Sequence, residues 1–178
     1  MNRKNIQFKR LTNINCDEYI FSETLLVESF PIDEYREIQE QRKNVESRDN
    51  FYMNIIYSST TPVGIISYWK FTAFTYVEHF AILPIHRNLG YGAAAIQKLT
   101  EKEKNIILEV EKPTDETSRR RISFYKRCGL TLCEKEYIQP AYRSDSNEVP
   151  MYLMSCGINL DENFENIRSS IYRIVYGK

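Results

Sequence analysis

The amino-acid sequence predicts a mixed α/β fold, in which an antiparallel strand meander is followed by a central βαβ unit in one mixed sheet. Three consecutive segments rich in β-branched and aromatic residues, joined by short turns, predict the meander: residues 51–57, 63–69 and 76–83. A helix expected at residues 89–104 then leads into residues 106–110, a nearly all-apolar strand. Such a strand is typically covered on both faces and parallel to its predecessor, which gives the βαβ unit.

Length and charge limit the classes of function. At 178 residues the chain is long enough for a substantial core, so we expect a single domain over residues 1–178. Lys plus Arg and Asp plus Glu both number 24, and this balance favours neither a nucleic acid nor an anionic membrane as partner. No apolar run reaches membrane-spanning length and none follows the basic residues 1–5, so we expect neither a membrane span nor a signal peptide.

The cysteines indicate a reducing compartment rather than a metal site. None of the four forms a C-x-x-C pair, and only two histidines are present to complete a ligand set: Cys16, Cys128, Cys133 and Cys156, with His79 and His86. We therefore expect no zinc, buried free thiols and a cytoplasmic location.

The first third of the chain is expected to hold one strand and two helices. Residues 6–14 fit a strand, and residues 17–30 fit a helix with Asp17 as N-cap and Pro31 as its stop. Residues 33–44 fit a second, strongly charged helix with little apolar surface. Such a helix is either a solvated surface helix or a mobile element that lines a cleft.

The chain is organised around the junction between the strand at residues 76–83 and the helix after it. Pro84 ends the strand because it removes a backbone donor. Arg87, Gly90 and Gly92 then precede a run of three alanines, so a cation and two glycines stand directly before a helix N-terminus. Unpaired N–H groups and the positive end of the helix dipole suit a phosphate or pyrophosphate there. The alternative is a tight turn that only starts the helix.

Two helices and two strands complete the chain. A helix expected at residues 118–128 begins with three arginines, which disfavour a helix N-terminus unless acids or a phosphate lie nearby. The last strands are expected at residues 130–138 and 151–156. An amphipathic helix at residues 161–176 packs either on the core or on a partner subunit, which would make a homodimer.

Three motifs resemble those of the GNAT acyltransferase superfamily and occur in the same order. Residues 87–92 match R-x-x-G-x-G, its acetyl-coenzyme A pyrophosphate loop, and residues 108–110 match the L-E-V strand of several members. Residues 124–129 match F-Y-x-x-x-G, with Leu130 in place of the usual Phe. The order of helices and strands over residues 6–156 is also similar, so the resemblance implies the GNAT fold and coenzyme A binding.

The resemblance implies a binding site for acetyl-coenzyme A (acetyl-CoA) between two strands that splay apart. The pantetheine arm would pair with the backbone near Ile82 and Leu83, and the amides of residues 88–92 would hold the pyrophosphate. A backbone N–H near Ile82 would polarise the thioester carbonyl and stabilise the oxyanion. The cofactor-binding residues that it implies are Ile82, Leu83, Arg87, Asn88, Leu89, Gly90, Tyr91 and Gly92.

Three residues are candidates for the proton transfers that accompany direct attack by an amine, the family's reaction. Tyr125 occupies the family's position for the acid that protonates the departing thiolate, and a phenol is protonated at pH 7. Its alternative role is packing on the core. Glu78 and Glu109 are candidates for the base, and a structural ion pair is the alternative for each.

The two carboxylates stand in different sequence contexts. Alternation along its strand would place Glu78 on the opposite face from Val77 and His79. Glu109 interrupts an apolar run, so it should have either a raised pKa or a cationic partner among residues 119–121. His79 is a third candidate base, although a lone strand histidine is more often simply hydrogen-bonded.

The sequence therefore favours an acetyl-CoA-dependent N-acetyltransferase that acts, without a metal, on a primary amine of a small molecule or peptide. The alternative from another class is a non-catalytic coenzyme A-binding sensor of the same fold. We expect the determinants of the acceptor in residues 23–48 and 139–150, where family chains vary most.

Overall fold

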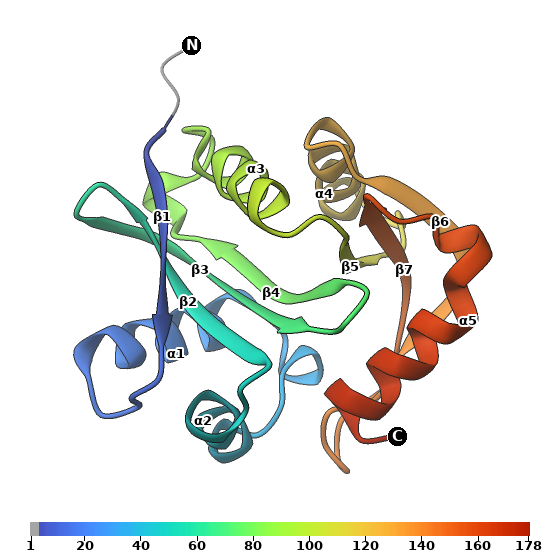
Figure 1. Cartoon of the computed structure of the whole chain (residues 1–178), viewed down its shortest axis with the longest axis horizontal. Helices are drawn as coiled ribbons and strands as arrows, with labels where there is room; N and C mark the ends of the chain where they lie inside the picture. The colour runs from blue at the N-terminus through green and yellow to red at the C-terminus, as the bar shows by residue number, and fades with distance from the viewer. Residues whose placement is uncertain (1–3) are drawn as a thin grey trace.

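The computed structural model describes residues 4–178, and the basic start of the chain at residues 1–3 lies outside this part. Within residues 4–178, seven strands form one mixed sheet in the order β1-β2-β3-β4-β5-β7-β6 (Figure 1). The strands are β1 (Ile6–Leu11), β2 (Phe51–Ser58), β3 (Thr61–Lys70), β4 (Thr75–Ile82), β5 (Ile106–Glu111), β6 (Thr131–Gln139) and β7 (Val149–Cys156). The helices are α1 (Asp17–Ser29), α2 (Ile38–Ser47), α3 (Tyr91–Lys102), α4 (Glu116–Arg127) and α5 (Leu160–Ile171).

The strand pairing confirms the predicted meander and βαβ unit. β1, β2 and β3 are each antiparallel to the next strand, whereas β4 and β5 are parallel and are connected through α3. β4 pairs with β5 only between residues 75–77 and 106–108, although β4 continues to Ile82 and β5 to Glu111. The two strands therefore separate over their C-terminal halves, which is the splay that the family resemblance implied.

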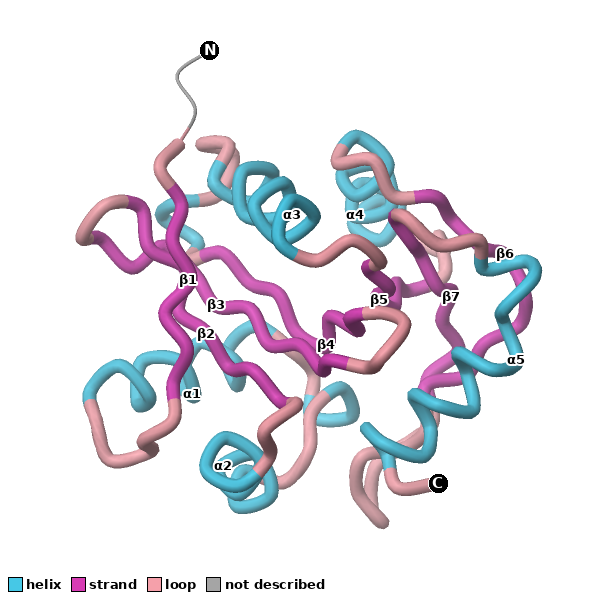
Figure 2. Tube along the Cα trace, viewed as in Figure 1, coloured by secondary structure: helices cyan, strands magenta, loops and turns pink. Residues whose placement is uncertain are grey.

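Helices cover both faces of the sheet (Figure 2). α1, α2 and α5 pack on one face, where Tyr19, Val45 and Ile167 belong to one apolar core. α3 and α4 pack on the other face, where Leu99 and Ile122 belong to a second core. β5 contributes side chains to both cores, which explains its nearly continuous apolar sequence. Of the two alternatives for the last helix, packing on the core is confirmed.

A β-bulge in β4 changes the direction of two candidate residues. Ser67 of β3 pairs with His79, but the next residue, Tyr68, pairs with Val77, so Glu78 is an extra residue in the ladder. The side chains of Glu78 and His79 therefore lie on the same face, with Nδ1 and Oε2 3.7 Å apart. The prediction that they lie on opposite faces was wrong, because simple alternation does not allow for a bulge.

The charged segment predicted as one helix over residues 33–44 is divided in two. The chain forms a 3-10 turn at Ile32–Glu34, runs extended, and becomes helical again at α2. Arg36 in the extended part is 2% exposed and pairs with Glu78 of β4. This tertiary contact outweighs the local helical pattern and anchors the segment against the sheet.

The helix ends also differ from the predictions. α1 follows Cys16 as its N-cap, without a side-chain cap, so Asp17 does not have that role. α4 begins earlier than expected because Asp115 and Ser118 form a capping box. The last helix stops at the end of α5, and a single π-helical turn follows at Tyr172–Tyr176.

The four cysteines are free thiols, but only Cys133 is buried. The other three are partly exposed, so the expectation of buried thiols was right for one of the four. Over residues 4–178, every helix is too short or too polar to cross a membrane.

Candidate active site

A cleft of about 290 Å³ opens where β4 and β5 separate. Residues from the segment before α2, from both strands, from the loop before α3 and from α4 line it, and they include Glu34, Glu78, Ile82, Arg87, Glu109 and Tyr125. Both candidate carboxylates, the candidate acid and the start of the candidate phosphate loop thus meet in one cavity, although they are far apart in the sequence.

The backbone of Ile82 faces this cleft. The Leu83 N–H donates to the Val63 carbonyl at 2.9 Å, which makes Ile82 and Gly64 a pair without mutual hydrogen bonds. The N–H and C=O of Ile82 therefore point away from β3 and toward the gap. Of the two backbone positions implied by the family resemblance, Ile82 offers its N–H to a ligand, while its C=O accepts from Arg87 and the Leu83 N–H is committed to the sheet.

The loop before α3 has the backbone of an anion-binding turn. Asn88 and Gly90 have positive φ angles of 61° and 84°, and α3 begins directly after Gly90. Glycine adopts the left-handed conformation without steric penalty, and the first N–H groups of a helix have no helical partners. The Arg87 Nε donates to the Ile82 carbonyl at 3.0 Å, which turns its side chain back toward the end of β4.

Gly92 lies in the first turn of α3, facing α4 and β4. A Cβ at this position would lie 3.4 Å from the Phe124 ring and 3.7 Å from the Ile82 side chain, which are ordinary contacts. Packing within the chain therefore does not require glycine here, whereas a closely approaching ligand would. Leu89 is exposed and Tyr91 is half-buried.

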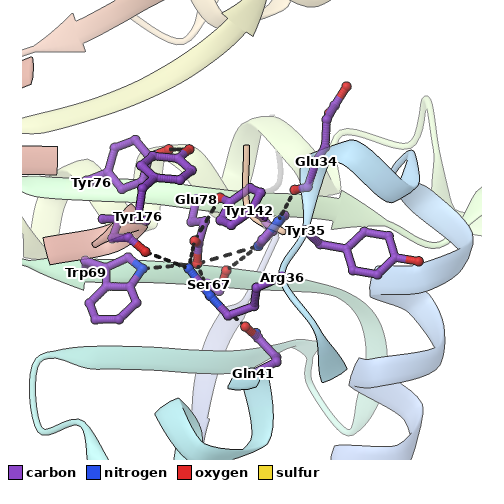
Figure 3. A network of polar contacts seen from close by, with 12 residues as sticks. Glu34, Tyr35, Arg36, Gln41, Ser67, Trp69, Tyr76, Glu78, Tyr142 and Tyr176 are labelled. Carbon is purple, nitrogen blue, oxygen red and sulfur yellow. Dashed lines mark hydrogen bonds and ion pairs between the residues drawn. The ribbon is translucent and has the colours of Figure 1, made fainter. Parts of the chain in front are cut away.

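Glu78 is held in a buried ion pair (Figure 3). The Arg36 guanidinium binds both carboxylate oxygens, the Trp69 Nε1 donates at 3.1 Å, and the Tyr142 hydroxyl donates at 2.9 Å. Burial alone would raise the pKa of Glu78, but Arg36 and the nearby His79 lower it overall. A carboxylate so fully engaged is a poor proton acceptor, which favours the structural alternative for this residue.

Arg36 is the partner that sequence reasoning missed. Its guanidinium also donates to the Gln41 side-chain oxygen at 2.8 Å and to the Val175 carbonyl at 3.4 Å. One signal was available, because a buried carboxylate such as Glu78 needs a cation. Nothing in the sequence indicated which cation, since Arg36 precedes Glu78 by 42 residues in a segment with a helical pattern.

Glu109 has a different environment. Its side chain accepts hydrogen bonds from the hydroxyl groups of Tyr137 and Tyr176, and the Tyr176 oxygen lies 3.0 Å and 3.1 Å from its two oxygens. Burial raises the pKa of Glu109 to about 7, although the tyrosine hydrogen bonds oppose this in part. A carboxylate with such a pKa in the cleft is suited to accept a proton at neutral pH.

The arginines at the start of α4 are not the partners of Glu109. Arg121 pairs with Glu111 at 2.5 Å. Arg120 pairs with Glu116 at 2.5 Å. Of the two alternatives for these arginines, nearby acids or a phosphate, the structure shows acids beside Arg120 and Arg121. Of the two alternatives for Glu109, a raised pKa was right and a cationic partner from this group was wrong.

His79 is fixed at both ring nitrogens. Its Nδ1 lies 3.1 Å from the Ser67 hydroxyl, and its Nε2 lies 2.9 Å from the backbone carbonyl of Glu34. Burial lowers the pKa of His79, although Glu78 opposes this effect. The ring therefore joins the segment before α2 to the sheet, as expected for a hydrogen-bonded structural histidine.

Tyr125 projects from α4 into the cleft and is 7% exposed. Burial raises its pKa to about 12, with a small opposing effect of Arg121. The phenol is therefore protonated at neutral pH. Its hydroxyl has no hydrogen-bond partner among residues 4–178, so it is free to donate to a ligand in the cleft.

Glu34 adds a carboxylate at the cleft that sequence reasoning did not single out. Burial raises its pKa to about 7, and Glu111 and Asp33 contribute, while Arg121 opposes. Figure 3 shows its side chain directed away from the Arg36–Glu78 pair. It lies in the region expected to determine the acceptor.

A second hollow of about 930 Å³ adjoins the N-terminal half of α3 and the end of α4. Its lining includes three cations and one acid, namely Lys4, Lys98, Arg127 and Glu101. Positive charge is therefore concentrated beside the loop that ends at Gly90.

Comparison with known proteins identifies the family. A sequence model of the Acetyltransferase (GNAT) family matches residues 8–130. The chain therefore belongs to the GNAT acetyltransferase family, a class of enzymes, and this confirms the resemblance of its motifs.

Individual proteins agree with this assignment. A solved structure described as a GNAT-family acetyltransferase of Bacteroides thetaiotaomicron is 45% identical, covers 97% of this chain and 99% of that one, and superposes with a TM-score of 0.93. YjbC of Bacillus subtilis (strain 168), named as an acetyltransferase, is 30% identical over 105 residues. That match spans 57% of this chain and 52% of YjbC, about half the length of the curated relative. A Bacillus subtilis acetyltransferase in complex with CoA shares the fold, with 12% identity, coverage of 86% of this chain and 98% of that chain, and a TM-score of 0.59.

Proposed function

We propose that the protein transfers the acetyl group of acetyl-CoA directly to a primary amine of a small molecule or peptide, with residues 1–178 acting as one domain. The observation that carries this proposal is the cleft between β4 and β5, where Ile82, Glu109 and Tyr125 meet. Direct transfer needs no nucleophile from the protein. It needs a donor for the developing oxyanion, a proton acceptor and a proton donor, and the cleft offers one group for each task.

The cofactor would enter as an added strand. Its pantetheine arm would lie along the C-terminal half of β4 and use the N–H and C=O of Ile82 that the sheet leaves free. The pyrophosphate would bind the N–H groups from Asn88 to Gly92. Arg87, which now donates to the Ile82 carbonyl, would exchange that bond for a phosphate oxygen. The basic hollow beside α3 offers a place for the nucleotide phosphate.

The proton steps assign different tasks to the two cleft groups. The acceptor arrives as an ammonium ion, and Glu109 takes one proton from it directly or through one water. The neutral nitrogen attacks the thioester carbon, a C–N bond forms, and the Ile82 N–H stabilises the oxyanion. The C–S bond then breaks, and the thiolate takes the Tyr125 proton. The acceptor nitrogen then gives a second proton to the Tyr125 phenolate, which becomes a phenol again, and Glu109 releases its proton to solvent. The products are the acetamide, the free CoA thiol and one proton.

Thiol release from acetyl-CoA tests this function. A panel of monoamines, diamines and short peptides should contain at least one compound that produces amine-dependent free thiol. Tyr125→Phe should lower kcat on the order of 100-fold, because it removes the general acid, while calorimetric binding of CoA stays unchanged. If acetyl-CoA binds but no amine releases thiol, the proposal fails and the alternative of a coenzyme A-binding sensor is favoured.

A further inference from the structure

Glu109 is a half-buried residue whose carboxylate is hydrogen-bonded by hydroxyl groups rather than paired with a cation. Among residues 4–178, no Lys, Arg or His forms an ion pair with it. An isolated ionised carboxylate is unfavourable in a buried site unless hydrogen bonds replace its lost hydration. The ionisation of Glu109 therefore depends on the donors that surround it.

Two of the donors that reach Glu109 are residues outside the cleft lining. Tyr137 comes from β6, on the far side of β7, and its hydroxyl donates to one carboxylate oxygen. Tyr176 comes from the turn after α5, and its hydroxyl oxygen lies 3.0 Å from the other carboxylate oxygen. The two tyrosines therefore hold both oxygens of Glu109.

The tyrosines are themselves held in place. The Tyr176 hydroxyl lies 3.2 Å from the hydroxyl of Tyr76, and Figure 3 shows these side chains beside each other. The Tyr142 ring packs on Tyr176 with centroids 4.7 Å apart, and Tyr137 is 1% exposed. Packing of this kind fixes the hydroxyl positions, so the direction of the Glu109 carboxylate is fixed as well.

We propose that Tyr137 and Tyr176 are positioning residues that keep Glu109 ionised and directed into the cleft, and thereby set the pH range of acetyl transfer. This inference rests on the proposed function. Glu109 lines the cleft, whereas neither tyrosine does, so both tyrosines act through the carboxylate rather than on the substrate.

The remaining groups that face Glu109 include one more hydroxyl but no unpaired cation. Tyr76 and Glu78 approach from β4; the Tyr76 hydroxyl lowers the pKa of Glu109 in the same direction as Tyr137 and Tyr176, and Glu78 is neutralised by Arg36. Tyr142 approaches from the connection between β6 and β7, with its hydroxyl donated to Glu78. No cation in this set would replace the hydrogen bond lost from Glu109.

The test is the pH dependence of kcat for thiol release, with saturating acetyl-CoA and the most active amine of the panel. Removing one hydrogen bond to a carboxylate raises its pKa by about one unit. Tyr176→Phe and Tyr137→Phe should each move the acid limb of kcat about one pH unit upward, so that activity is lost at pH 6–7 and recovered at higher pH. Either variant can serve if the other folds poorly.

Tyr172→Phe is the matched control. Tyr172 lies in the same turn as Tyr176, but its hydroxyl donates to the backbone carbonyl of Ile138. The Tyr172→Phe variant loses a hydrogen bond in the same segment but none to Glu109. The acid limb of its kcat should therefore overlay that of the wild type. The inference is wrong if the acid limb of kcat stays in place in both Tyr137→Phe and Tyr176→Phe, or if it moves equally in Tyr172→Phe. Either result would leave the proposed function standing. A wild type that releases no thiol overturns the proposed function together with the inference.

Discussion

Replacing Arg36 by Met tests whether Glu78 is a structural carboxylate. The Glu78 and Arg36 side chains are 0% and 2% exposed, and the guanidinium binds both carboxylate oxygens. Removing one partner of a buried pair destabilises a protein by about 3–5 kcal/mol, because the other charge is left buried. We therefore expect the free energy of unfolding of Arg36→Met to fall by about 3–5 kcal/mol at pH 8.

The loss should depend on pH in a direction that the structure defines. In the wild type the pKa of Glu78 is lower in the folded protein than in the unfolded chain. The Arg36–Glu78 pair therefore stabilises the fold at pH values above the unfolded-state pKa of Glu78. This stabilisation is lost as the pH falls through the folded-state pKa. Without Arg36, burial would raise the pKa of Glu78, and the folded variant would bind a proton that the unfolded chain does not. The difference between variant and wild type should therefore shrink from pH 8 to pH 5.

Urea unfolding at the two pH values measures this difference. Arg42→Met is the control, because the Arg42–Glu23 pair is 36% and 18% exposed and solvent screening leaves such a pair little to contribute. An Arg36→Met loss no larger than that of the control, or equal at pH 8 and pH 5, would refute the assignment of Glu78 to the structure.

Two further predictions concern the ligands. Gly92→Glu should abolish CoA binding measured by calorimetry, because a carboxylate would occupy the space for the pyrophosphate. Gly92→Ala should stay folded, because its Cβ would make an ordinary contact with Phe124 at 3.4 Å. Unchanged affinity for CoA in Gly92→Glu would contradict the loop assignment. Glu34→Gln should raise the KM of a diamine several-fold and leave that of a monoamine with an uncharged tail unchanged. The effect should be larger at pH 8 than at pH 6, because a carboxylate with a pKa of about 7 is mostly ionised only at the higher pH; equal changes for both amines would contradict a role in binding cations.

The order of helices and strands could be predicted because local patterns determine it. The apolar run of β5, the β-branched and aromatic residues of the meander and the glycines before α3 each carry their signal within a few residues. Glu109 was found for the same reason, since a lone acid in an apolar run is conspicuous. Its raised pKa follows from burial, which the run itself indicates.

The remaining features of the site depend on tertiary contacts. Arg36 lies in a segment with a helical pattern, yet its pairing with Glu78 makes the backbone extended. The bulge that directs Glu78 and His79 to one face arises from pairing with β3, which alternation cannot indicate. Tyr137 and Tyr176 reach Glu109 across 28 and 67 residues, so no spacing in the sequence joins them.

The most direct test of the proposed mechanism is kcat for amine-dependent thiol release by Glu109→Gln at pH 7.5. The amide has nearly the shape of the carboxylate but cannot accept the ammonium proton, so kcat should fall about 100- to 10,000-fold. CoA binding by calorimetry should be unchanged, because no cofactor contact is assigned to this side chain. A Glu109→Gln enzyme with the kcat of the wild type would contradict the assignment of Glu109 as the base.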